Sequence, residues 1–150
     1  MKSTITFHHQ DGDMTFRVRW GWFLVTTSNR LSFSIECEEE SEYSWMSMPS
    51  FCLVDFPLEG PLEAGKVIRF EGNKGEVNDG EPHSHVYVGV HQSPCEVEVR
   101  FKRVAKNSCD VELSWVQPDT DYYDERAKKN RVVGQCTLKR GERKNIWIPQ

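Results

Sequence analysis

The sequence predicts an all-β fold: an antiparallel β-sandwich, or a barrel, of about nine or ten strands in a single domain spanning residues 1–150. Apolar and polar residues alternate in most segments, and this period of two places one row of side chains on a buried face of a strand. Turn-forming Gly, Pro, Asn and Ser residues separate these segments. A chain of 150 residues with 37% hydrophobic content can also bury a self-sufficient core.

The N-terminal third predicts two hairpins. Asp11-Gly12 separates the first pair of alternating segments, and this dipeptide tolerates the positive φ angles of a tight turn. Gly21 interrupts the pattern between the two hairpins, so it predicts a kink or a corner. We therefore expect a four-stranded meander, with strands at residues 3–9, 13–20, 22–27 and 31–37.

The remainder of the chain continues the β pattern. Prolines and glycines between Met48 and Lys66 predict a crossover that holds one short buried strand at residues 51–54. One short helix is expected at residues 121–129, where acidic residues precede basic residues by four positions. Further strands are expected at residues 66–71, 85–91, 95–104, 109–117, 132–139 and 145–148.

Composition narrows the classes of function. The formal net charge is −4 and basic residues are scattered among acidic ones, so the basic stripe needed for nucleic-acid binding is missing. No apolar run approaches the roughly 20 residues of a membrane-spanning helix, and the first residues predict a strand instead of a secretory signal. Five cysteines without a Cys-x-x-Cys pair predict buried, reduced thiols and a cytoplasmic protein.

The strongest candidate site is the acidic and aromatic segment 119–125. Tyr122 and Tyr123 are large amphipathic rings of the kind that dominate protein interfaces. The neighbouring carboxylates of Asp119, Asp121 and Asp124 suit a basic partner surface. We expect this segment to bind a protein partner. The alternative structural role is a helix N-terminus, where acidic residues are favourable beside the helix dipole.

The same carboxylates allow a second hypothesis, calcium binding. A hard cation needs several oxygen ligands from a loop, and residues 119–125 supply four carboxylates. The order of a strand, Asp-x-Asp, Asn130, two apolar residues, Gly and a second strand resembles the third calcium loop of C2 domains over about 20 residues. The loop is longer than in that family, and Arg131 stands where an acidic ligand is expected. The resemblance implies a calcium-dependent binding module that uses Asp119, Asp121 and Asp124.

A third hypothesis uses histidines. His83 and His85 lie two residues apart in a predicted strand, so both imidazoles share a face, as in metal sites of β-barrels. The pair resembles the His-x-His of cupins, although no Glu follows at the expected spacing. It implies a small barrel metalloenzyme with zinc bound by His83 and His85, and His91 lies nearby in sequence.

Catalytic motifs are otherwise missing from the sequence. It contains neither a Gly-x-Ser-x-Gly elbow nor a phosphate-binding glycine loop. The sequence therefore favours a non-catalytic module over an enzyme, without a cofactor in the leading hypothesis. Long alternating strands also allow a dimer formed through exposed sheet edges.

Overall fold

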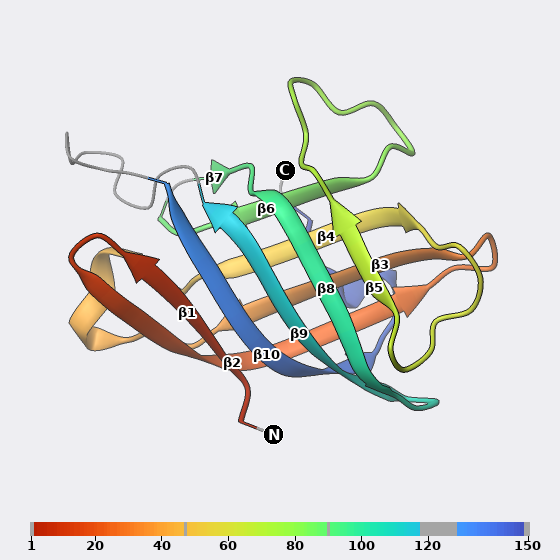
Figure 1. Ribbon diagram of the computed structural model, residues 1–150, viewed down its shortest axis with the longest axis horizontal. Helices are drawn as coiled ribbons and strands as arrows, with labels where there is room; N and C mark the ends of the chain where they lie inside the picture. Colours follow the sequence, from red (N-terminus) through yellow and green to blue (C-terminus); the bar gives the residue numbers. More distant parts are fainter. Residues whose placement is uncertain (1, 47, 90, 118–128, 149–150) are drawn as a thin grey trace.

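The computed structural model describes residues 2–46, 48–89, 91–117 and 129–148 (Figure 1). These residues form ten strands and two short 3₁₀ turns. The strands are β1 (Thr4–His9), β2 (Gly12–Val25), β3 (Arg30–Cys37), β4 (Ser50–Pro57), β5 (Val67–Phe70), β6 (His83–Tyr87), β7 (His91–Gln92), β8 (Cys95–Val104), β9 (Ser108–Gln117) and β10 (Asn130–Arg140), and the turns are η1 (Ser41–Met46) and η2 (Arg143–Asn145).

All ten strands belong to one sheet, in the order β5-β8-β9-β10-β1-β2-β3-β4-β6-β7. Neighbouring strands in this order are antiparallel. A short parallel contact pairs Lys139 of β10 with Trp22 of β2. The predicted all-β antiparallel fold of nine or ten strands is confirmed, while the choice between a sandwich and a barrel stays a prediction.

The sheet folds over so that its two halves face each other. In Figure 1, β8, β9 and β10 cross in front of β3, β4 and β6. Trp115 of β9 stacks on Phe51 of β4, with ring centroids 4.4 Å apart and an interplanar angle of 12°. Phe7 of β1 meets Trp115 edge to face at 6.3 Å. These rings come from the alternating apolar rows of their strands, and they join the two halves of the sheet in one core.

Strand β2 replaces the two predicted strands 13–20 and 22–27, so the N-terminal meander has three strands. The register between β2 and β3 shifts between Val18 and Trp20, just before Gly21, and β2 continues unbroken through the predicted corner. A Cβ atom on Gly21 would lie 2.6 Å from a methyl group of Leu138. A side chain at position 21 would therefore displace the side chain of Leu138 on β10. Beyond the bulge, Trp20 and Trp22 share the outer face.

Three further predictions differ from the structure. The predicted strand 85–91 is a hairpin, because β6 and β7 pair with each other. The predicted crossover contains β4, which extends to Pro57 and pairs with β3. The predicted strand 145–148 is wrong: η2 occupies its start, and residues 146–148 belong to no strand. The predicted helix 121–129 lies outside the described residues, except for Lys129.

The chain end builds a second, smaller core on the outer face of the sheet. Ile146 and Trp147 pack over Cys52 and Val54 of β4. The backbone N–H of Trp147 donates a hydrogen bond of 3.0 Å to Oγ of Ser34 on β3. This packing covers the apolar side chains on the second face of β4 without any strand pairing by the chain end.

The cysteines are all free, and Cys37, Cys52, Cys109 and Cys136 are buried. Burial raises the pKa of Cys37, Cys52 and Cys109 to about 12. The predicted burial is confirmed for Cys37, Cys52, Cys109 and Cys136, while their reduced state stays a prediction. Within the described ranges, no helix is long and apolar enough to cross a membrane.

Candidate functional site

The segment predicted to bind a partner connects two strands that are already paired. Gln117, the last residue of β9, is the ladder partner of Asn130, the first residue of β10. Twelve residues, 118–129, separate these two positions in the sequence. A β-hairpin needs only about two to five connecting residues. The connection is therefore much longer than the pairing of β9 with β10 requires.

The two residues that flank this connection, Gln117 and Asn130, are both buried. Gln117 is fully buried, and Nε1 of Trp115 donates a hydrogen bond of 3.0 Å to its Oε1 atom. Trp115 is itself fixed by its stack on Phe51. Asn130 is 7% exposed. The predicted partner-binding or calcium-binding residues start from this anchor, but Asp119, Asp121, Tyr122, Tyr123 and Asp124 lie outside the described residues.

A second acidic loop, residues 71–82, leaves the same end of the sheet. Strands β5 and β9 are both antiparallel to β8, so they run in the same direction and their last residues point to one end. Within the loop, the Glu81 carboxylate accepts a hydrogen bond of 3.0 Å from the Asn78 amide. The Arg30 guanidinium donates to the carbonyl of Gly80 at 2.8 Å and fastens the loop to β3. Glu76 and Asp79 are exposed.

The histidine candidates do come together. His83 and His85 share the outward face of β6, where they alternate with buried Ser84 and Val86. His91 lies on β7 opposite Tyr87, so the hairpin brings its ring beside His85. Nε2 of His85 and Nδ1 of His91 are 2.8 Å apart and share a hydrogen bond. His91 is close to the pair in sequence, but no local pattern predicts this contact.

Burial, together with the neighbouring His91 and His83, lowers the pKa of His85 to about 4. The ring is therefore uncharged at neutral pH. It lies beside Trp147 from the chain end, with ring centroids 5.7 Å apart. Neither Trp147 nor the nearby Arg143 was predicted at this place, because more than 50 residues separate them from β6 and no local pattern reports such a contact.

His83 and His85 line a hollow of about 420 Å³ between β6, the loop 71–82 and the chain end. Nδ1 of His83 is enclosed and has no hydrogen-bond partner among the described residues. The charged residues that line the hollow are Asp55, Asp79, Glu81 and Arg143. In the part of the chain that the structure describes, no three or more His, Cys, Asp or Glu side chains are grouped to hold a metal ion.

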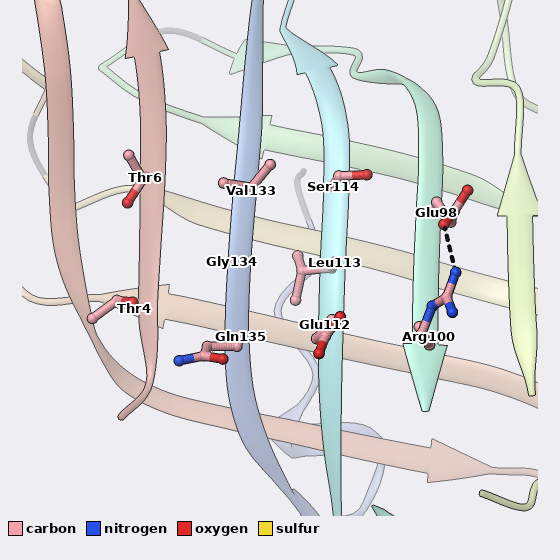
Figure 2. A pocket seen from close by; sticks show the side chains of 10 residues that line it. All are labelled: Thr4, Thr6, Glu98, Arg100, Glu112, Leu113, Ser114, Val133, Gly134 and Gln135. Atoms are coloured by element: carbon pink, nitrogen blue, oxygen red, sulfur yellow. Dashed lines mark ion pairs between the residues drawn. The ribbon is translucent and has the colours of Figure 1, made fainter. Parts of the chain in front are cut away.

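A second hollow, of about 450 Å³, lies on the outer face of β8, β9, β10 and β1. Figure 2 shows Thr4 and Thr6 on one side of it and Glu98 and Arg100 on the other. Glu98 and Arg100 form an ion pair of 3.7 Å, and Glu98 also pairs with Arg69 at 3.2 Å. The lining contains neither His nor Cys. This face therefore presents paired charges and hydroxyl groups. Its lining offers no histidine to act as a general base near neutral pH.

Comparison with known proteins gives no relative for this chain. No protein-family model, no curated protein and no solved structure matches it.

Proposed function

We propose that this protein is a non-catalytic binding domain that engages a protein partner through residues 118–129. Tyr122 and Tyr123 provide the buried contacts of the complex, and Asp119, Asp121 and Asp124 select a basic partner surface. The observation that carries the proposal is the pairing of Gln117 with Asn130. A twelve-residue connection between paired strands is long for a hairpin, and long connections are commonly functional.

The free cysteines support a reducing compartment, and we assign the protein to the cytoplasm on this ground. The partner is a different protein instead of a second copy of the chain. Both ends of the sheet are short, with four residues in β5 and two in β7. Short edge strands disfavour edge-to-edge pairing.

The test is capture of a partner from extracts of the source cells, followed by affinity measurement with the purified partner. Tyr122→Ala with Tyr123→Ala should weaken binding by at least about 30-fold, the size expected for interface hot spots of 2 kcal/mol or more. Asp119→Asn, Asp121→Asn and Asp124→Asn together should slow association, and the effect should shrink at high salt.

Two controls are matched to these variants. Trp20→Ala removes an aromatic ring that is 45% exposed on the outer face. Glu38→Gln, Glu39→Gln and Glu40→Gln together remove the same number of charges from another part of the surface. Both controls should keep wild-type affinity. Unchanged affinity of the double tyrosine variant would contradict the proposal, and binding that requires calcium would favour the C2-like alternative at Asp119, Asp121 and Asp124.

A further inference from the structure

The outer face of the β6–β7 hairpin carries two imidazoles in direct contact. His85 is half-buried beside Trp147, and His91 is exposed at the edge of the sheet. Their ring nitrogens Nε2 and Nδ1 face each other at 2.8 Å. In this hydrogen bond one ring nitrogen carries the proton and the lone pair of the other accepts it, so one lone pair already points at the neighbouring ring. Histidine binds metals through such a lone pair.

The two nitrogens are close enough to share one ion. Two nitrogens bound at about 2.0–2.1 Å from one ion are roughly 2.9 Å apart at a right angle and roughly 3.3 Å apart at a tetrahedral angle. The observed hydrogen bond of 2.8 Å shows that the two rings can approach to this range. A nitrogen site binds Cu²⁺ more tightly than Ni²⁺ or Zn²⁺, and tetragonal sites of nitrogen and water ligands suit Cu²⁺ and Ni²⁺.

The surroundings leave the pair accessible to water. His91 is exposed, so water can reach the remaining coordination positions, and His85 also lies at the wall of the hollow of about 420 Å³. Three carboxylate residues and one arginine line this hollow: Asp55, Asp79, Glu81 and Arg143. The enclosed Nδ1 of His83, two residues along the same face, adds a polar atom without a partner in the described structure.

We propose that His85 and His91 chelate one divalent transition-metal ion, Cu²⁺ or Ni²⁺ before Zn²⁺, with water completing its coordination. The ring that donates the shared hydrogen bond changes tautomer by exchanging protons with water, so that its proton resides on its other ring nitrogen. Both rings stay neutral, and each directs the lone pair of the facing nitrogen at the ion. None of the residues that carry this site belongs to the connection 118–129.

The experiment uses tag-free protein stripped with EDTA and dialysed, titrated with CuSO₄ or NiCl₂ by calorimetry and by tryptophan fluorescence. One ion should bind per chain. Cu²⁺ should quench part of the emission, because Trp147 lies 5.7 Å from His85. Trp147→Phe should remove that part of the quenching while the calorimetric binding persists.

His91→Ala should weaken binding by at least about tenfold, since loss of even an outer-shell partner costs 10–100-fold in metal affinity. His91 is exposed, so this variant should keep the wild-type circular dichroism spectrum. His8→Ala is the matched control: it removes another exposed histidine, one that is bonded to Asp13 at 2.8 Å, and it should bind like wild type. Absence of saturable binding, or equal binding by His85→Ala with His91→Ala, would overturn the proposal.

Discussion

Asp110 shows how one side chain can make the stability of the fold depend on pH. Its carboxylate accepts hydrogen bonds from Nε of Arg103 at 2.8 Å and from Oγ1 of Thr137 at 2.7 Å. These donors come from β8 and β10, on either side of β9. The hydrogen bonds from Arg103 and Thr137 lower the pKa of Asp110. The charged carboxylate therefore links three neighbouring strands.

We expect Asp110→Asn to lower the free energy of unfolding at neutral pH. The pKa of Asp110 in the folded state is below its ordinary value of 3.8, so the charged form contributes stability above that pH. This contribution is lost as the pH falls through the folded-state pKa. The difference between wild type and variant in urea unfolding should therefore be largest near pH 7 and should shrink below about pH 4.

Glu112→Gln is the control for this prediction. Glu112 lies two residues along the same strand and pairs with Lys102 at 3.6 Å, and both side chains are 50% exposed. Exposed ion pairs contribute little to stability. The Glu112 variant should follow the wild-type curve at every pH. An Asp110→Asn effect that is the same at pH 3 and pH 7 would contradict the role assigned to the charge.

Single residues also mark the limit of local sequence patterns. The burial of Cys109 and Cys136 could be predicted, because both lie in the apolar rows of alternating segments. The close contact of Gly21 with Leu138 could not be predicted. Its neighbours in sequence suggest a corner, but the atom that would clash with a Cβ belongs to Leu138. A contact between residues so far apart depends on how the strands pair, which alternation alone does not specify.

At the scale of elements, the sequence predicts the burial of β4 correctly but not the structure of the chain end that covers it. Phe51, Cys52, Leu53 and Val54 are all buried, because the main core covers one face of the strand and the chain end covers the other. An uninterrupted apolar run predicts this double burial. The segment that covers the second face, Ile146 to Ile148, is also apolar, so the sequence predicts a strand there, and this prediction is wrong.

We expect Ile146→Ala to loosen this cover. Truncating a buried isoleucine costs about 2–5 kcal/mol of stability, and the loss should favour local opening of the chain end. Cys52 is 0% exposed, and burial raises the pKa of its thiol to about 12. In the variant, Cys52 should react faster with a thiol reagent such as DTNB under native conditions, and chemical denaturation should measure the loss of stability.

Assignment of the reactive thiol needs a second variant. Ile146→Ala combined with Cys52→Ala should lose the added reactivity. Cys37, Cys109 and Cys136 lie in the main core, so their protection should be unchanged. Equal acceleration at these three thiols would show global unfolding, and the chain end would then not be a separate cover.

At the scale of the whole molecule, strand existence was largely predictable and strand neighbours were not. Most predicted segments overlap an observed strand because period-two alternation reports a buried face. The pairing of Thr4 with Gln135, which places β1 beside β10, has no signature in either segment. The same holds for the candidate sites: the connection 118–129 stands out by composition, whereas the contact between His85 and His91 depends on the turn between β6 and β7.

We expect the fold to tolerate a much shorter connection. Replacing residues 118–129 with Asn-Gly should preserve the sheet, because Gln117 and Asn130 are already ladder partners. Shortening the loop reduces the entropy cost of closing it by roughly 1–2 kcal/mol. The thermal midpoint should rise by about 2–6 °C. The variant should also lose the proposed partner.

Circular dichroism is the check on this deletion. A wild-type far-ultraviolet spectrum with an unchanged or higher midpoint would show that the connection is dispensable for folding. A fall in the midpoint of more than about 5 °C would show that residues 118–129 contribute to the core, and their proposed role as a free binding surface would be wrong.

The position of β1 between β2 and β10 also has a consequence during synthesis. Strands β1, β2 and β3 are close in sequence and can pair as soon as they emerge from the ribosome. The other side of β1 pairs with residues 132–135, which are translated more than 120 residues later. Until then the nascent sheet has an open edge, so the early meander is the stage at which the chain is most exposed to aggregation and to chaperones.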